Sequence, residues 1–228
     1  LLAVIAIVAQ LVQIPVGGWL TPLALCAVVV VFTFPWDNWA VRRGVWDFPD
    51  ERLIARIAAL PVEEIFFFVV QTLQVGWLTA LLLRLMPGPM VGSVSFEQPT
   101  LLAMGAMFLL WAVAGLVTRS TRSARSHWTY AWHLFYWFSP IILVQWMFGW
   151  DLLAPRFAVI ALATASVGTF LILSDIWAVR RGIWFFDERQ ITGGRIATIL
   201  PWEEAAFFYV TSLLVAQSTI LLLPADAR

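Results

Sequence analysis

The sequence predicts an all-α integral membrane protein with seven transmembrane helices. Apolar residues make up 61% of its 228 residues. Charged residues make up only 12%, about half the charged fraction of an ordinary soluble domain. The mean hydropathy is +0.86. The apolar residues also fall into long stretches separated by Arg, Gly or Pro clusters, a pattern that is typical of helices crossing a bilayer.

Seven apolar stretches provide the predicted spans, because about 20 mostly apolar residues cross the hydrocarbon core as a helix. The first stretch is short and lacks the basic flank and cleavage site of a signal peptide. Because the chain opens at Leu1 without a Met, we expect that some of this span precedes Leu1. The stretches cover residues 1–16, 19–41, 53–83, 100–118, 130–149, 156–179 and 196–223.

The arginines predict the orientation of these helices, because basic residues concentrate in cytoplasmic loops. Seven spans place most of the arginines on one side of the membrane. This asymmetry predicts a multi-pass protein of the cell membrane with a cytoplasmic N-terminus. The cytoplasmic set is Arg42, Arg43, Arg52, Arg56, Arg119, Arg122, Arg125, Arg180, Arg181, Arg189 and Arg195, and the opposite set is Arg84, Arg156 and Arg228.

An internal repeat divides the chain. The segment 37–46 recurs at 175–184 with eight of ten positions identical, and a Leu-Pro-x-Glu-Glu motif follows it in both halves. We expect two parallel three-helix repeats, at 1–85 and 126–228, joined by a linker helix and loops at 86–125.

The most informative residues are two pairs of glutamates, Glu63-Glu64 and Glu203-Glu204. Each pair is predicted to lie about two turns inside an apolar helix, where an acid costs about 2.5–3.5 kcal/mol to insert. Function is the default explanation of such a cost. Apolar surroundings and a neighbouring carboxyl both favour the protonated form, so at least one glutamate is expected to act as an acid. The structural alternative is that the glutamates pair with Arg56 and Arg195, or with each other, and so lock the helices together.

Pro61 and Pro201 stand two residues before the first glutamate of each pair. Inside a helix, each would remove a hydrogen bond and open a kink beside the acids. The alternative is that each proline starts the helix and that the Arg-rich segment before it is interfacial.

Three further polar residues belong to the repeated segment. Asp37 and Asp175 could hydrogen-bond to the glutamates or pair with arginines at the interface, and the sequence favours neither. Asn38 stands where the second half has Ile176, so the halves are not expected to play identical parts.

Aromatic rings accompany the acids. Phe67 and Phe207 belong to aromatic runs that follow the glutamates, and Trp39 and Trp177 belong to the repeated segment. The tryptophans would ordinarily join the interfacial aromatic belt, as would Trp46 and Trp184, although an inward ring can stabilise a cation.

Several functions are excluded by absent residues. The single cysteine and two histidines provide neither a disulfide framework nor a Cys/His metal site, and the chain has no lysine for a retinal Schiff base. No nucleotide-binding glycine motif is present, and the balanced charge argues against nucleic acid as a partner. We therefore expect no metal and no cofactor.

The duplicated motifs resemble the cofactor-free membrane lycopene cyclases, including the cyclase half of fungal bifunctional enzymes. Pro-x-Glu-Glu at 61–64 and 201–204, Asp-x-Trp-Ala-Val-Arg-Arg-Gly at 37–44 and 175–182, and the three-one-three layout carry this resemblance, which covers nearly the whole chain. It implies lycopene or a related linear carotenoid as substrate, contact with membrane lipid and an association with other carotenoid enzymes.

The implied reaction is a non-redox isomerisation. A terminal double bond takes a proton, the tertiary cation is attacked by an internal double bond, and a proton leaves to give a β-ionone ring. A neutral carboxyl, a nearby carboxylate and aromatic faces suit these steps. Glu63, Glu64, Glu203 and Glu204 are the candidate catalytic residues, without a choice between donor and acceptor.

A second function remains possible from the residues alone. A parallel three-one-three repeat also describes small proton-coupled solute transporters, in which acids inside the membrane could couple protons to a solute. The Phe and Ile residues around the acids here do not suit a sugar.

Overall fold

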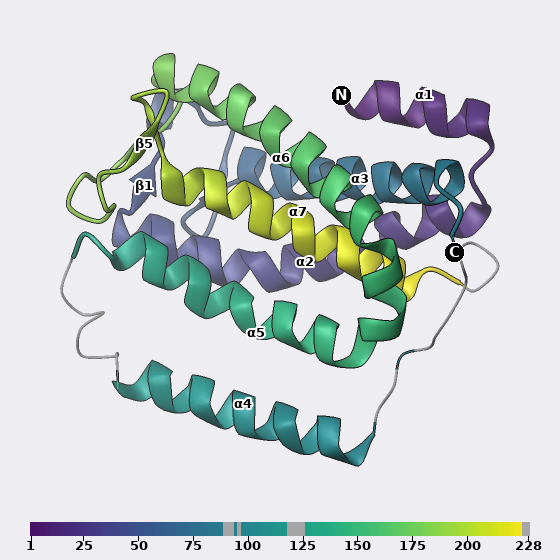
Figure 1. Cartoon of the computed structure of the whole chain (residues 1–228). Helices are drawn as coiled ribbons and strands as arrows, with labels where there is room; N and C mark the ends of the chain where they lie inside the picture. Colours follow the sequence, from purple (N-terminus) through teal and green to yellow (C-terminus); the bar gives the residue numbers. More distant parts are fainter. Residues whose placement is uncertain (89–93, 95–96, 118–125, 225–228) are drawn as a thin grey trace.

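The computed structural model describes residues 1–88, 94, 97–117 and 126–224, and its helices run roughly along one direction (Figure 1). Each helix is apolar around most of its circumference, as expected for helices surrounded by protein or lipid. The helices are α1 (Leu2–Val12), α2 (Val16–Arg43), α3 (Val62–Leu85), α4 (Gln98–Val117), α5 (Thr129–Leu153), α6 (Phe157–Arg180) and α7 (Trp202–Leu222).

Five helical stretches are long and apolar enough to cross a membrane: Val16–Arg43, Val62–Leu85, Gln98–Val117, Thr129–Arg180 and Trp202–Leu222. The stretch Thr129–Arg180 contains α5, the short 3₁₀ helix η3 (Ala154–Arg156) and α6. Helix α1 is apolar but has only 11 residues. The predicted fold class, an all-α membrane protein, is confirmed at this level.

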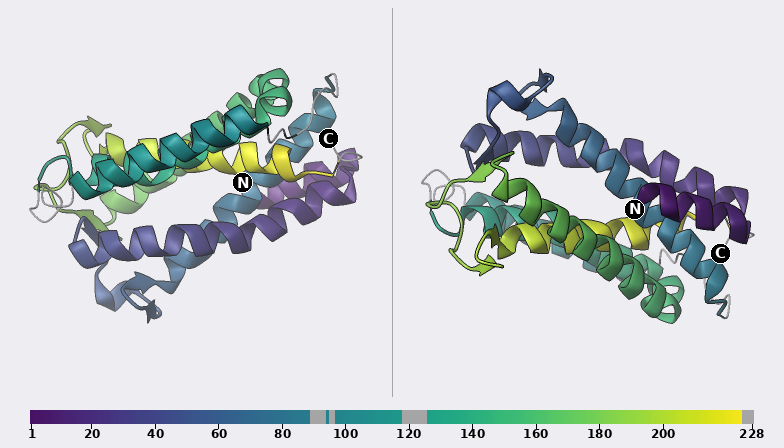
Figure 2. Two further views of the ribbon diagram at one scale, coloured as in Figure 1. Left: turned by 90° about the horizontal axis from the view of Figure 1, so that it is seen from below. Right: turned by 90° about the horizontal axis from the view of Figure 1, so that it is seen from above.

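The helices pack in two groups that meet along α3 and α7. Helix α3 packs against α1 and α2, and α7 packs against α5 and α6. Contacts of α3 with α6 and α7 join the groups, and α4 packs on the outer side of α5. Figure 2 shows α2 on one side of the molecule and α4, α5 and α6 on the other, with α3 running obliquely between the two sides.

Short strands occupy the loops at one end of the helices. β1 and β4, which come from the two halves of the chain, pair antiparallel with each other, whereas β2–β3 and β5–β6 are local hairpins. The strands are β1 (Trp46–Asp47), β2 (Arg56–Ile57), β3 (Leu60–Pro61), β4 (Phe185–Phe186), β5 (Arg195–Ile196) and β6 (Leu200–Pro201), with a 3₁₀ turn, η1, at Asp50–Arg52.

These hairpins correct two expectations. Helices α3 and α7 begin at Val62 and Trp202 rather than near residues 53 and 196, because the hairpins occupy the residues before them. The predicted kink was therefore wrong. Pro61 and Pro201 are the residues that cap the two helices, in agreement with the alternative that each proline starts its helix.

The repeated Arg-Arg-Gly sequence ends a helix in both halves. Gly44 caps α2 with φ of 69°, and Gly182 follows α6 with φ of 62°. Only glycine adopts this left-handed conformation without a steric cost, and it lets the chain turn out of the helix. In each half of the chain, this glycine thus turns the backbone toward the strand segment that precedes the glutamate pair.

The described arginines gather mainly at this strand-bearing end. Arg42 and Arg43 end α2, Arg180 ends α6, and others lie in the hairpin segments. Arg84, by contrast, lies in the last turn of α3, at the opposite end. The structure therefore keeps most of the described arginines together, whereas Arg119, Arg122, Arg125 and Arg228, which the charge argument also used, lie outside the described residues.

Candidate active site

Both glutamate pairs lie in the first turn of a helix, at the same end of the molecule. Glu63 and Glu64 open α3, and Glu203 and Glu204 open α7. They are therefore not two turns inside a helix, as the sequence predicted. The first turn reduces the cost of an acid, because free backbone N–H groups and the helix dipole favour negative charge there.

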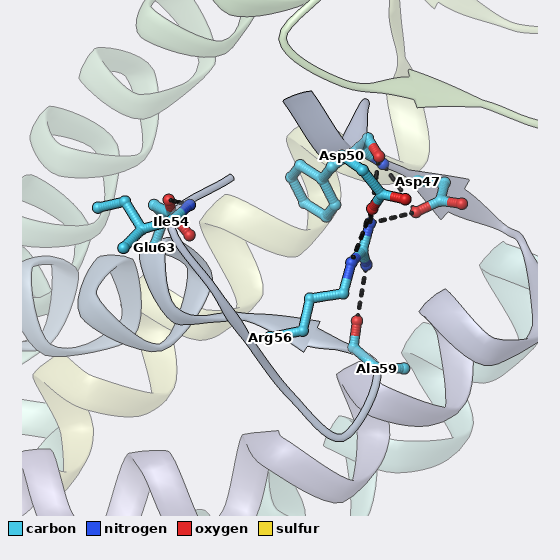
Figure 3. A network of polar contacts seen from close by, with 7 residues as sticks. Asp47, Asp50, Ile54, Arg56, Ala59 and Glu63 are labelled. Carbon is cyan, nitrogen blue, oxygen red and sulfur yellow. Dashed lines mark hydrogen bonds and ion pairs between the residues drawn. The ribbon is translucent and has the colours of Figure 1, made fainter. Parts of the chain in front are cut away.

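The first glutamate of each pair holds the loop before its own helix. Glu63 Oε1 accepts a hydrogen bond of 2.7 Å from the backbone N–H of Ile54 (Figure 3). Glu203 Oε1 accepts two bonds of 2.7 Å, from the backbone N–H and the hydroxyl of Thr192. These contacts give the first glutamates a structural role at the base of each hairpin.

The arginines before the prolines bind loop residues rather than the glutamates. Arg56 forms ion pairs with Asp47 (3.3 Å) and Asp50 (2.9 Å) and donates to the carbonyl of Ala59 (Figure 3). In the second half, Arg195 pairs with Glu188 and donates to the carbonyl of Ile199. The predicted alternative, in which these arginines neutralise the glutamates, is contradicted among the described residues.

Asn38 also supports a hairpin. Its side-chain oxygen accepts a hydrogen bond of 2.9 Å from the backbone N–H of Ala59, in the turn between β2 and β3. Ile176, at the equivalent place in α6, has no side-chain acceptor. The clearest asymmetry of the repeated segment thus concerns loop geometry.

The second glutamates turn inward and lie within electrostatic range of two aspartates. Glu64 and Glu204 are buried, as are Asp37 on α2 and Asp175 on α6. Each aspartate interacts electrostatically with both glutamates, and the two glutamates interact with each other. One Asp and one Glu from each half therefore form a single cluster of four carboxyl groups, which we call the carboxyl cluster.

No cation neutralises the carboxyl cluster within the described residues. No arginine there forms an ion pair with any of the four groups. The oxygens of Asp37 and Asp175 have no hydrogen-bond partner in the described chain, and the indole of Trp46 interacts with Asp37 only outside ordinary hydrogen-bond geometry. Burying four negative charges together would cost many kcal/mol, so the cluster must hold protons. No metal-binding group was found in this part of the chain either.

Tyr130 makes the two halves of the cluster different. Its hydroxyl lies at the start of α5 and donates a hydrogen bond of 2.5 Å to Glu204 Oε2. All three tyrosines of the chain lie in its second half, and within the described residues Glu64 receives no comparable hydrogen bond. The two inward glutamates therefore differ in that a tyrosine hydroxyl donates a hydrogen bond to Glu204 only, among the described residues.

A small cavity of about 10 Å³ separates the inward glutamates, with room for about one water molecule. Trp36 and Phe207, which both line it, stack on each other with ring centroids 5.1 Å apart. A carotenoid end group would enter only if these rings moved apart. The lining residues are Trp36, Trp46, Glu64, Tyr130, Trp184, Phe186, Glu204 and Phe207.

The four rings predicted to stabilise a cation occupy different places. Phe207 lines the cavity, whereas Phe67 packs against Phe68 and Phe208 behind it. Trp39 packs against His133 with its ring tilted, 4.0 Å between ring centroids. Trp177 is 56% exposed and lies beneath Arg181, away from the cavity.

Sequence reasoning did not select most of the cavity rings. Trp46 and Trp184 belong to the repeated segment but were assigned to the interfacial belt, and Trp36 and Phe186 lie just outside it. Tyr130 carried no signal, because it follows a loop and belongs to no repeated motif. A search for aromatic residues within or directly beside both copies of the repeat would have found the two tryptophans inside it and the two rings beside it.

A turn at residues 187–190 positions Tyr130. The backbone N–H of Tyr130 donates to the carbonyl of Gln190 (3.0 Å), and the Gln190 amide donates to Asp187 (3.1 Å) and to the carbonyl of Gly44 (2.9 Å). Asp187 also pairs with Arg189 at 3.1 Å. Hydrogen bonds from Arg189 hold the pKa of the Asp187 carboxyl below its usual value.

This lowered pKa predicts a pH-dependent stability difference. The contribution of the pair is present above the unfolded pKa of Asp, about 3.9, and is lost as the pH falls through the lower folded value. Arg189→Gln should therefore lower the melting temperature at neutral pH, and the difference from the unmodified protein should shrink below about pH 4. Thermal unfolding in detergent across this range measures it, and a difference independent of pH would contradict the assignment.

Comparisons with known proteins identify the family of the chain. The family model described as lycopene cyclase matches residues 1–82 and 126–222, which include both glutamate pairs. The chain is 33% identical over 198 residues to a lycopene beta-cyclase of Halobacterium salinarum, covering 86% of this chain and 79% of that protein. The chain belongs to the lycopene cyclase family. The matched ranges omit α4 and cover the helices that carry the carboxyl cluster.

Bifunctional fungal proteins provide further relatives. The chain is 31% identical to a bifunctional lycopene cyclase/phytoene synthase of Phaeosphaeria nodorum and 27% identical to one of Aspergillus oryzae. It spans 34% and 33% of these proteins, respectively. No solved structure gave a significant match. The comparisons give no support to the transporter alternative.

Proposed function

We propose that this protein is a lycopene β-cyclase, which closes linear carotenoid end groups into β-ionone rings by acid catalysis. The observation that carries the proposal is the carboxyl cluster, which is buried beside a cavity walled by aromatic rings and has no cationic partner among the described residues. The lycopene cyclase family model matches the ranges that contain the cluster, and a relative named lycopene beta-cyclase covers 86% of the chain. The cyclisation needs no oxidant, because it moves one proton in and one proton out.

In the proposed mechanism, Glu64 is the proton donor. It lines the cavity and receives no hydrogen bond from a described tyrosine, so its proton is free to reach the terminal double bond. Protonation gives a tertiary cation, and the internal double bond attacks it to close the six-membered ring. Proton transfer by a positioned carboxyl typically accelerates such a step about 10²- to 10⁴-fold.

Glu204 is the proposed acceptor of the proton that leaves the new ring. It already accepts a hydrogen bond from Tyr130, which orients one oxygen and leaves the other available. Asp37 and Asp175 interact with both glutamates, so they are proposed to pass the proton back to Glu64 between turnovers. The donor is thereby recharged without a cofactor.

The cavity rings are proposed to protect the cation. Trp36 and Phe207 line the cavity together with both inward glutamates, and they stack on each other. Once they move apart, each ring would offer a π-face, which attracts a cation within about 6 Å of its centroid. The same rings keep out water, which would otherwise convert the cation into an alcohol. Phe207 is retained from the predicted rings, and Trp36, Trp46 and Trp184 are added.

We also propose how the chain sits in the membrane. Two parallel units, α1–α3 and α5–α7, would be related by an axis along the membrane normal and joined by α4, with the strand-bearing end in the cytoplasm. The arginines that end α2 and α6 support this orientation, which gives a cytoplasmic N-terminus. The carboxyl cluster then lies near the cytoplasmic face, with α4 among lipid.

Product identification tests the proposed function. The purified protein is placed in liposomes with lycopene and without flavin or nicotinamide, and the pigments are separated and identified by absorption and mass. We expect products of unchanged mass that carry β-ionone rings. Lycopene recovered unchanged under these conditions, from protein that remains folded, would refute the proposal.

A further inference from the structure

An open apolar groove of about 570 Å³ lies on the surface between α2 and α5. Its lining carries no charged side chain, and Val28 and Val31 are largely exposed. In a helix that spans a membrane, such side chains face lipid. The lining residues are Ala27, Val28, Val31, Phe32, Pro35 and Trp137.

Aromatic contacts connect this groove with the cavity beside the glutamates. Phe32, in the groove, lies 5.8 Å from Phe138 between ring centroids. Phe138 in turn lies 5.1 Å from Trp36 and 6.1 Å from Phe207, both of which line the cavity. A ligand in the groove is thus separated from the carboxyl cluster by a short series of rings and no charged group.

The second half of the chain does not repeat this apolar surface. When the register of the repeat is continued upstream, Val28 and Val31 of α2 correspond to Ser166 and Thr169 of α6. The hydroxyl of Thr169 lies 3.0 Å from the hydroxyl of Tyr209, so that position is polar. Ala27 corresponds to Ala165, which is also exposed. The groove is therefore a feature of α2 rather than a general property of the repeated helix.

We propose that the groove between α2 and α5 binds the linear polyene chain of the substrate and loads it from the bilayer. This inference rests on the proposed function, because a carotenoid whose end group reaches Glu64 needs an apolar path for the rest of its chain. The groove meets this need: it faces lipid, it is lined by apolar side chains, and its rings continue to the cavity. Phe32 and Phe138 are the rings that must move to admit the end group.

Filling the groove tests this inference. Ala27→Trp places a large ring among the lining residues, and Ala165→Trp places the same ring at the matched position of α6. Binding is measured on a Glu64→Gln background, which should hold lycopene without turnover, from the induced circular dichroism of lycopene in liposomes. We expect Ala27→Trp to weaken binding more than about tenfold, the loss that follows 1.4 kcal/mol of lost apolar contact, and Ala165→Trp to leave it unchanged.

A second variant guards against misfolding. Val31 is 75% exposed, so the larger side chain of Val31→Phe occupies part of the groove without entering the core. The helix content of this variant, measured by circular dichroism, checks that it folds. Both groove variants, on the unmodified background, should also slow lycopene cyclisation. If the unmodified protein is active and both groove variants bind and cyclise lycopene as well as it does, the groove inference is overturned while the cyclase function stands. If the unmodified protein cyclises nothing, the proposed function itself fails.

Discussion

Glu64→Gln and Glu204→Gln are each expected to slow β-ring formation by about 10²- to 10⁴-fold, the usual contribution of a general acid or base. Glutamine keeps the shape of the side chain but cannot give or take the proton. Both residues line the cavity, one from each half of the chain. The rate is measured in liposomes from the appearance of cyclic pigment, with the amount of folded protein determined in the same sample.

The neighbouring glutamates provide matched controls on the same helix turns. Glu63→Gln and Glu203→Gln keep a side-chain oxygen that can accept the hydrogen bonds from Ile54 and Thr192, so cyclisation should continue near the unmodified rate. Equal losses for all four variants would mean that position along the helix, rather than orientation toward the cavity, governs the chemistry. Normal activity in Glu64→Gln or Glu204→Gln would remove that residue from the mechanism.

Deuterated water separates the two roles within the same variants. In Glu204→Gln, Glu64 can still protonate the terminal double bond, but the ring proton has no acceptor, so the cation reverts and leaves deuterium in recovered lycopene. In Glu64→Gln, protonation itself is blocked and recovered lycopene stays unlabelled. The opposite labelling pattern would exchange donor and acceptor.

Trp36→Ala is expected to destabilise the protein by about 3–5 kcal/mol, the range for truncating a large buried ring. Trp36 is 1% exposed and stacks on both His133 and Phe207. Removing it leaves a cavity at the meeting place of α2, α5 and α7, because neighbouring rings fill such a space only in part. Equilibrium or thermal unfolding in detergent measures the loss.

Trp177→Ala is the control for this loss. Trp177 is the same residue type on the other repeat-bearing helix, but it is exposed and contacts mainly Arg181. Its truncation should change stability by no more than about 0.5 kcal/mol. Similar losses in the two variants would show that the buried ring cluster around Trp36 is not what stabilises this end of the molecule.

The sequence predicted the features that depend on composition and spacing. Long apolar stretches predict helices of membrane-spanning length, and the close similarity of 37–46 to 175–184 predicts equivalent local structure in both halves. The left-handed glycines at Gly44 and Gly182 illustrate this equivalence. The buried position of Asp37 and Asp175 was left open, because a carboxyl near a helix end can equally face arginines or the core.

The features that were missed depend on contacts between distant residues. The starts of α3 and α7 were placed too early because Ile57 and Ile196 are apolar and extend the neighbouring stretches, although both belong to hairpin strands. The different roles of Glu63 and Glu64 follow from which side of the first turn faces Ile54. Tyr130 reaches Glu204 from 74 residues away, and no local pattern announces such a contact.

The pairing of β1 with β4 fixes how far apart the two halves hold their acids. Trp46 lies opposite Phe186, and Asp187 N–H donates to the carbonyl of Val45, so backbone hydrogen bonds fasten equivalent loops to each other. This strand pairing would hold the proposed donor and the proposed acceptor at a fixed spacing while the cavity rings move to admit an end group. The same strand pairing would align two separate polypeptides, each bearing one inward glutamate, without a peptide link between them.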